Sequence, residues 1–588
     1  MEISESLLPY VSLPAAFLDP LDYVSAPPVK HTPSENNSRE AWTHSVHNPA
    51  NRPNSLANPD FSVWRVDGCS SKGRQYLLVR LPTQRNNFPT AIDLYIPDQT
   101  RHPPPLRALL GTSTASFTTP IKWKDLCSFI CGALQYWEST VHVDFDLLLE
   151  AMPLGSCIVL ENLSSTFQNM AFRLYPQMGY ETRFLSLDSL KSMWVNDRIN
   201  LPPVVRLKEL NIKWRLTPHV SAIKHPRARS EILWVYKSKI SNPRHLYHEL
   251  RNLLLLQPHP NVLSQPAYLV TTNMYASNDE RVCGFILEHY PLGHLGQAIE
   301  RMRFQGVPDM RIQLDWAIQL TSTIEHILHT KVGFYSELRP ENVVCGPGNL
   351  LVLIDFEQAG NWSTFTAPEV LYLENLRWLR ESQHVPHSFK VRYQDILKRH
   401  LPNQAPPGNN YMSSDCGYFE EWKSMPIENR EAAMVFSLGK VLWCIFECWG
   451  HTMNGVEEEF DTPCAWEFPE CRRAPDTIRE LIAACTKGKT WFSTPGASRL
   501  VRLREKIYPL GQTGHYGEPE ASALETLLVA KRTMLRNLEV MEQYLEAKLR
   551  LENHEASDDD MEMLGFPRRP KLRDVLNVLQ KELAKTTR

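Results

Sequence analysis

Residues 333–369 constrain this chain more than any other part of the sequence. They place Glu337 and Asn342 five residues apart in a proline-containing loop, and they place Asp355 directly after a short apolar run. A short apolar run bounded by polar residues is consistent with a buried strand. A carboxylate that orients a hydroxyl, with an amide and a second carboxylate that bind a divalent cation, is the set of groups that phosphoryl transfer requires. The stretch therefore indicates a phosphoryl-transfer site.

This stretch resembles the catalytic core of the protein kinases. Residues 335–342 read Tyr-Ser-Glu-Leu-Arg-Pro-Glu-Asn where that family has His-Arg-Asp-Leu-Lys-Pro-Glu-Asn. Residues 355–357 read Asp-Phe-Glu in place of Asp-Phe-Gly, and residues 367–369 are the family's Ala-Pro-Glu. In detail the motifs look like those of a fungal group of kinase-like proteins, and the resemblance covers about residues 204–588.

The resemblance implies a bilobal α+β fold of the protein kinase type, in which a small β-rich lobe precedes a larger helical lobe. Upstream, strand and helix patterns predict an accessory α+β region of unknown role, and a proline-rich start without glycine predicts an irregular N-terminal arm. The expected boundaries are 1–60 for the arm, 61–203 for the accessory region, 204–290 for the small lobe, 291–588 for the larger lobe, and about 371–430 and 487–560 for two insertions in it.

Four residues outside the central stretch are implied to bind nucleotide. Lys237 ends a predicted strand and Glu249 lies on the next predicted helix, and the resemblance implies that this pair holds the α- and β-phosphates of ATP. Leu287 would border the adenine pocket, and Glu288 would begin the hinge between the lobes. The implied cofactors are ATP and magnesium.

Within the stretch, the resemblance implies one role for each polar residue. Asn342 and Asp355 would bind Mg²⁺, Arg339 would contact the γ-phosphate, and Glu337 would orient the acceptor hydroxyl. Glutamate is one methylene longer than the aspartate of the family, and a displacement of ~1 Å can cost on the order of 100-fold in rate. Slow transfer is therefore expected.

Other departures from the family pattern fall at positions that serve catalysis. Tyr335 and Ser336 replace the histidine and arginine of the loop, and Met434 stands where an aspartate normally braces it. The expected phosphate-covering segment, residues 214–219, has no glycine, so its backbone amides approach phosphate oxygens less easily. The segment between residues 355 and 369 is short, which leaves little surface to grip a peptide and argues against its control by phosphorylation.

These features predict an atypical ATP-dependent protein serine/threonine kinase with slow transfer. One alternative is a pseudokinase that acts as a nucleotide-binding or scaffolding module. A further alternative is a small-molecule kinase on the same fold, which the short 355–369 segment favours. The expected partners are ATP and a protein substrate or partner protein.

The bulk composition excludes several other classes. A net charge of -3 and an isoelectric point near 6.7 give no argument for nucleic acid or a membrane surface. Twelve cysteines without paired C-x-x-C clusters argue against a disulfide framework or a zinc site. No secretory signal pattern appears, and the longest apolar run, residues 435–449, is too short to span a bilayer. These observations predict an intracellular protein, cytoplasmic or nuclear.

Four predictions concern packing rather than catalysis. The cysteine pairs 127/131 and 444/448 have helical spacing and are expected in the core. A long helix over 521–551 is expected to pack within the chain through a leucine stripe, and the acidic run 558–560 is expected to be a solvated loop. The resemblance further implies a buried structural ion pair between Glu369 and Arg569.

Overall fold

The computed structural model describes the chain in two compact units. The first unit contains the described residues up to Pro291, and the second contains those from Leu292 onward. The predicted N-terminal arm, residues 1–60, lies outside the described residues. These are 62–70, 75–83, 88–96, 120–141, 143–162, 167–224, 232–240, 243–275, 277, 279–306, 308–358, 365–381, 387–401, 420–450, 471–488, 499–503, 506–510, 523–566 and 568–586.

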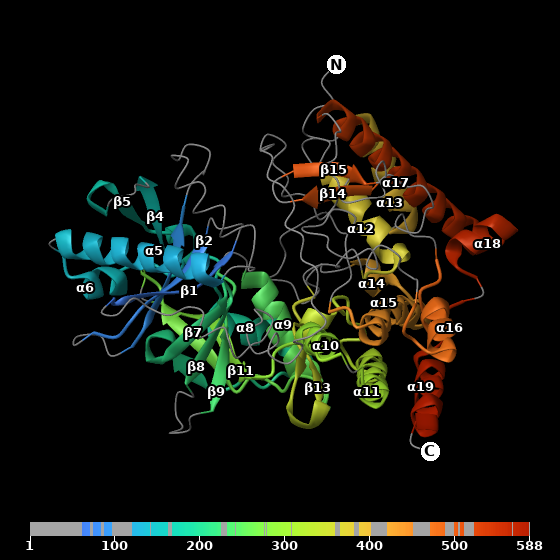
Figure 1. The fold of residues 1–588 in the computed structure, drawn as a ribbon, viewed down its shortest axis with the longest axis horizontal. Helices are drawn as coiled ribbons and strands as arrows, with labels where there is room; N and C mark the ends of the chain where they lie inside the picture. The colour runs from blue at the N-terminus through green and yellow to red at the C-terminus, as the bar shows by residue number, and fades with distance from the viewer. Residues whose placement is uncertain are drawn as a thin grey trace. The chain divides into compact units, whose positions relative to one another are not determined.

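The first unit begins with a five-stranded sheet, drawn in blue and teal in Figure 1. Its neighbouring strands are antiparallel except for β3 and β4, which are parallel and are therefore joined by a crossover through helices α5 and α6. The elements are β1 (Trp64–Ser70), β2 (Gln75–Arg80), β3 (Thr90–Tyr95), α5 (Pro120–Thr140), α6 (Phe145–Glu150), β4 (Cys157–Asn162) and β5 (Ala171–Tyr175).

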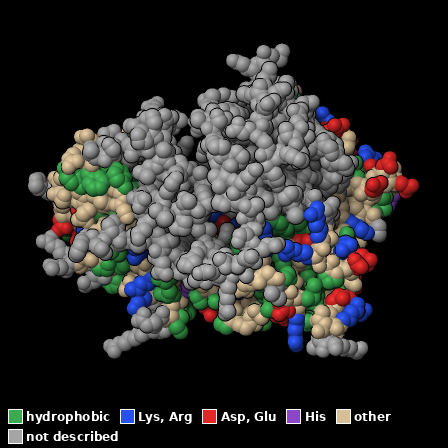
Figure 2. Space-filling model, in the orientation of Figure 1, with side chains coloured by type: hydrophobic (Ala, Val, Ile, Leu, Met, Phe, Trp, Pro, Cys, Tyr) green, Lys and Arg blue, Asp and Glu red, His purple; other side chains and the backbone are tan. Residues whose placement is uncertain are grey.

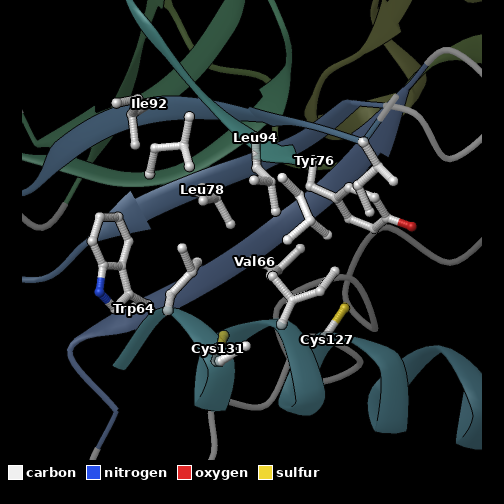
Figure 3. Packing of buried hydrophobic residues seen from close by; sticks show 14 of the residues in the cluster. Trp64, Val66, Tyr76, Leu78, Ile92, Leu94, Cys127 and Cys131 are labelled. Atoms are coloured by element: carbon white, nitrogen blue, oxygen red, sulfur yellow. The ribbon is translucent and has the colours of Figure 1, made fainter. Parts of the chain in front are cut away.

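Helix α5 covers one face of this sheet, as Figure 3 shows. Alternate residues of β1, β2 and β3 point toward the helix, because side chains along a strand alternate between its two faces. Cys127 and Cys131 of α5 lie in this cluster and are almost fully buried, which confirms the prediction that they are core residues. The region is mixed α and β, as expected from its sequence pattern.

A six-stranded sheet completes the first unit. Its strand order is β6-β10-β11-β9-β8-β7, so that β7 lies at one edge. A single long helix, α9, connects β9 to β10, and two short helices precede β6. The elements are α7 (Met178–Glu181), α8 (Leu187–Met193), β6 (Val204–Arg206), β7 (Ile212–Thr217), β8 (Val220–Lys224), β9 (Leu233–Lys237), α9 (Pro243–Leu255), β10 (Tyr268–Asn273) and β11 (Glu280–Glu288).

The described part of the second unit is mainly helical and contains two short antiparallel hairpins, one formed by β12 and β13 and the other by β14 and β15. Helix α15 lies at its centre and is buried from residue 433 to residue 447, which explains why this run is apolar without a helical period. Cys444 and Cys448 are fully buried there, as predicted. The elements are α10 (Leu295–Phe304), α11 (Met310–Leu328), β12 (Val343–Cys345), β13 (Leu351–Leu353), α14 (Glu420–Ser424), α15 (Ile427–Glu447), α16 (Asp476–Cys485) and α19 (Leu572–Thr586).

The two expected insertions contribute to one shared core. Residues of α12 and α13 from the first insertion pack against Leu538, Met541, Tyr544 and Leu545 of α17 from the second. For its described side chains, the leucine stripe of the long helix therefore packs within the chain, as predicted. The elements are α12 (Pro368–Glu381), α13 (His387–His400), β14 (Arg499–Leu503), β15 (Lys506–Leu510), α17 (Ala523–Glu552) and α18 (Asp558–Leu564).

The prediction of a solvated loop at residues 558–560 is wrong. These three aspartates form the first turn of helix α18, where acidic side chains are stabilised by the helix dipole. Ser557 and Asp560 form a capping box, and Arg550 binds the Asp560 carboxylate at 2.6 Å. Ser557, which precedes the acidic run, is a helix N-cap residue and was the sequence signal for this helix.

On the face shown in Figure 2, basic and acidic side chains of the described residues are interspersed. They form no extended patch of a single sign among the side chains drawn in colour there. Among the described helices, none combines the length and the apolar character needed to cross a membrane.

Candidate functional site

The first unit holds Lys237 and Glu249 in a buried ion pair. Strand β9 ends at Lys237, and helix α9 carries Glu249 back to it, so that Lys237 Nζ lies 2.6 Å from Glu249 Oε2. The exposed fractions of the two side chains are 11% and 1%. Burying two charges is costly unless they are paired in good geometry. The pair expected from the sequence is therefore present.

The hairpin formed by β7 and β8, called here the β7–β8 hairpin, turns beside Lys237. Val220 is in register with Lys237, and the backbone N–H of Ser238 donates to the His219 carbonyl at 2.8 Å. The turn at Pro218 and His219 contains no glycine. Burial, and then the charges of Lys239 and Lys237, lower the pKa of His219 to about 4, so this imidazole is neutral near pH 7.

Strand β11 carries Leu287 and Glu288 at its end. Leu287 is buried and pairs with Val235 of β9, whereas Glu288 is exposed. Closer to the middle of β11, a Cβ added to Gly284 would lie 2.5 Å from the carbonyl oxygen of Lys237. Glycine therefore permits the close approach of the two strands that fixes the position of Lys237.

In the second unit, the β12–β13 hairpin brings the backbone of Asn342 next to that of Ile354, the residue before Asp355. Asn342 immediately precedes β12, and its carbonyl accepts a hydrogen bond from the N–H of Ile354 at 2.9 Å. Asp355 follows Ile354, so the predicted metal ligands lie at the same end of the hairpin. The Asn342 side-chain amide donates to the Glu337 carbonyl at 3.0 Å, which ties the 335–342 loop to this end.

Asp355 adopts a strained backbone conformation. Its φ of 64° lies in the left-handed region, which residues other than glycine rarely occupy, and Gln358 has a φ of 46°. Such strain persists only where the surrounding structure holds it, and it is common at functional sites. Phe356, between them, is fully buried and meets the ring of Tyr335 edge-on at 5.2 Å.

The 335–342 loop is braced by side chains that differ from those of the family pattern. The N–H of Tyr335 donates to Met434 Sδ at 3.3 Å, and the N–H of Ser336 donates to Gln358 Oε1 at 3.1 Å. The Tyr335 hydroxyl donates to the Ile354 carbonyl at 2.6 Å. Because the Tyr335 side chain is buried, the pKa of its phenol is raised well above its usual value, so it remains a donor.

Sequence reasoning missed the role of Gln358. Met434, in place of the family's aspartate, was expected to leave the loop without its usual hydrogen bonds. In the structure, the N–H of Tyr335 donates to Met434 and the N–H of Ser336 donates to Gln358. Thioether sulfur is a weak acceptor, so the amide of Gln358 is the stronger of the two contacts. The available signal was a glutamine directly after the Asp-Phe-Glu motif, at a position with no apolar role.

Glu369 and Arg569 form the expected structural ion pair. Arg569 Nη1 lies 2.6 Å from Glu369 Oε1, and Nη2 lies 3.2 Å from Oε2. The Tyr544 hydroxyl also donates to Glu369 at 3.2 Å. Burial alone would raise the pKa of Glu369, but the adjacent Arg569 outweighs it and holds that pKa below its usual value. The pair joins the start of α12 to the segment before α19.

The predicted site residues thus gather in two groups. In the first unit, Lys237 meets Glu249, with the two β11 residues on the neighbouring strand. In the second unit, Glu337, Arg339, Asn342 and Asp355 share one loop and one hairpin, and all except the buried Asn342 are partly exposed. No protein-family model matches the sequence, and no curated protein matches it.

Proposed function

We propose that the chain is an ATP- and magnesium-dependent phosphotransferase of the protein kinase type that acts on a serine or threonine hydroxyl. The observation that carries this proposal is the buried ion pair of Lys237 and Glu249. A lysine held by a glutamate keeps its ammonium at a fixed place, and it retains further N–H donors for phosphate oxygens.

The topology around the pair supports the same reading. β7, β8 and β9 are consecutive antiparallel strands, so Lys237 lies on the third, as the phosphate-binding lysine does in protein kinases. Glu249 lies on the helix that follows. Leu287 and Glu288 end the strand next to β9, where the adenine pocket and the hinge are expected.

The residues of the second unit fit a magnesium ion and an acceptor hydroxyl. Carboxylate and amide oxygens, such as those of Asp355 and Asn342, are the ligands that Mg²⁺ prefers. When bound, the ion would neutralise phosphate charge. Glu337 is partly exposed in the same loop and would orient the hydroxyl, and Arg339 would contact the γ-phosphate.

A pseudokinase is the second candidate, and the structure of the 335–342 loop favours it. Tyr335 is committed to the Ile354 carbonyl, and Ser336 has no guanidinium to receive an activating phosphate. Such a protein would bind nucleotide without transferring phosphate and would act as a scaffold for a partner protein. A small-molecule kinase remains the third reading.

A phosphotransferase that uses ATP would work inside the cell, in the cytoplasm or nucleus. The described cysteines are free thiols, which is the expected state in a reducing compartment.

The test is phosphate transfer from radiolabelled ATP with magnesium, using the full chain and, as acceptors, itself, mixed proteins and small alcohols. We expect slow labelling of protein, a loss on the order of 100-fold in Lys237→Met and Asp355→Asn, and faster labelling in Glu337→Asp, because the shorter carboxylate removes a ~1 Å displacement.

The outcomes separate the candidates. Labelling of alcohols alone would favour the small-molecule kinase. ATP binding without labelling of any acceptor would favour the pseudokinase, and labelling that is equal in wild type and Asp355→Asn would contradict the proposal.

A further inference from the structure

Arg215 fastens the turn of the β7–β8 hairpin to the accessory region. Its Nη1 donates to Asp93 Oδ1 at 2.5 Å and to the Ile92 carbonyl at 3.1 Å, both on β3. Its Nη2 lies 3.5 Å from the Pro218 carbonyl in the turn. Gln75 donates to the second oxygen of Asp93 at 2.7 Å. The planar guanidinium therefore fixes the distance between the turn and the five-stranded sheet.

The accessory region also covers the open edge of β7. An edge strand presents backbone N–H and C=O groups that lack a neighbouring strand. Asp67 of β1 accepts from the backbone N–H of Arg215 at 2.6 Å, and Arg65 Nη2 donates to the Lys213 carbonyl at 2.5 Å. Arg65 and Asp67 bind each other at 2.5 Å, so the two side chains that bind the edge of β7 form one ion pair.

A second set of bonds holds helix α9. The Tyr247 hydroxyl accepts from the N–H of Leu185 at 2.8 Å and donates to the Val282 carbonyl at 2.7 Å. One turn along, Arg251 binds Asp197 at 2.7 Å. Leu185 and Asp197 belong to the accessory region, and Val282 belongs to β11.

Glu249 lies between these two anchors on α9. Tyr247 is fully buried, so moving the helix would leave its hydroxyl and the groups that it binds without partners. The same movement would separate Glu249 from Lys237. The anchors and the ion pair are therefore formed or lost together.

We propose that the accessory region is a built-in positioning element, which holds the β7–β8 hairpin and helix α9 so that the Lys237–Glu249 pair is formed before nucleotide binds. Arg215 and Tyr247 are its positioning residues. In protein kinases the corresponding ion pair must be in place for activity, and phosphorylation of the activation segment often controls it. The sequence argues against such control here, because Ser336 stands in place of the arginine and the 355–369 segment is short. In this proposal the accessory region holds the ion pair in place permanently. This inference rests on the proposed function only for its effect on ATP.

The first test is amide hydrogen exchange of the full chain without nucleotide. We expect Arg215→Met to accelerate exchange of the hairpin by about tenfold or more, and Tyr247→Phe to do so in α9, because each leaves buried polar groups unpaired. Arg173→Met is the matched control, since Arg173 makes an exposed ion pair with Glu161 in the same region. If Arg215→Met fails to fold, Arg215→Lys replaces it, because lysine keeps the charge but loses the fork.

The second test is a double-mutant cycle on ATP affinity. Tyr247→Phe should weaken ATP binding by about tenfold in the wild-type background and have little further effect in Glu249→Gln, because both changes remove the same positioned lysine. A purely structural role for Tyr247 would weaken binding equally in both backgrounds.

The outcomes separate this proposal from the proposed function. Unchanged exchange in folded Arg215 and Tyr247 variants would overturn the positioning role, whatever ATP does. Equal ATP affinity in wild type and Tyr247→Phe would overturn it while leaving the nucleotide site intact. If wild type binds no ATP, the proposed function fails, and the exchange experiment alone decides whether the accessory region positions α9.

Discussion

The Lys237–Glu249 ion pair and the 335–342 loop differ from the kinase pattern to very different degrees. The ion pair matches the pattern, and the loop does not. The first keeps both expected charges at 2.6 Å, buried between a strand and a helix. The second has Tyr335, Ser336 and Met434 where the family pattern has histidine, arginine and aspartate, and its backbone N–H groups donate to Met434 and Gln358. An ion pair needs two specific partners, whereas a backbone N–H accepts any correctly placed acceptor. Loop geometry can therefore be retained with different residues.

The largest expected effect concerns the buried pair of Glu369 and Arg569, which serves as a reference for the pair of Lys237 and Glu249. Arg569→Ala should lower the free energy of unfolding by ~3–5 kcal/mol, because it leaves the Glu369 carboxylate buried without its cation. Guanidinium denaturation followed by tryptophan fluorescence measures this. The double variant Glu369→Leu/Arg569→Met should recover most of the loss. Destabilisation of the double variant as large as that of the single one would show that the pair is not the cause.

Gln358→Leu tests whether the 335–342 loop depends on the hydrogen bond from Ser336 to Gln358. The N–H of Ser336 would remain buried without an acceptor, which should cost about 1–3 kcal/mol in the free energy of unfolding. Gln358→Glu keeps an acceptor oxygen and is the matched control, with a smaller expected loss. Denaturation curves that coincide for wild type and Gln358→Leu would mean that Met434 alone suffices.

Acid should weaken the first unit through His219. Its pKa is about 4 in the folded chain and ~6.5 when unfolded, so the unfolded state binds more protons between these values. The stabilisation is complete above pH 6.5 and is lost as the pH falls toward 4, by at most about 3 kcal/mol. His219→Gln should flatten this part of the stability–pH curve. An unchanged slope would contradict the burial of the His219 imidazole, which is the main cause of its lowered pKa.

The smallest effect is expected at the exposed pair of Arg173 and Glu161. Both side chains are substantially exposed, so solvent screens their attraction. Arg173→Ala should change the free energy of unfolding by less than about 0.5 kcal/mol in the same denaturation assay. A loss of unfolding free energy as large as that of Gln358→Leu would contradict the expectation that exposed contacts contribute less than buried ones.

Local patterns predicted much of the fold. Helices α9 and α17 were predicted from the sequence, and the burial of the cysteine pairs followed from helical spacing. The ion pair of Glu369 and Arg569 followed from motif resemblance, because each residue lies in a recognisable segment. Asp560 shows the limit, since its charge indicated solvent while Ser557 indicated a helix cap.

The contacts that brace the site were not predictable in the same way. Gln358 binds a loop 22 residues away, and Arg215 binds Asp93 across 122 residues. Side-chain bonds of this kind join segments without any shared period or motif. Arg215 was expected in the phosphate-covering segment 214–219, whereas the structure places it on strand β7, and Gln358 lies in the segment after β13. The partners of both side chains depend on tertiary packing.

The most direct measurement is titration calorimetry of ATP, with and without magnesium, on wild type and Asp355→Asn. The proposed nucleotide site predicts binding that requires magnesium and is lost in the variant, because the amide cannot replace the carboxylate as an ion ligand of equal charge. Absence of any heat of binding at millimolar ATP, with a folded wild-type chain and magnesium present, would contradict it.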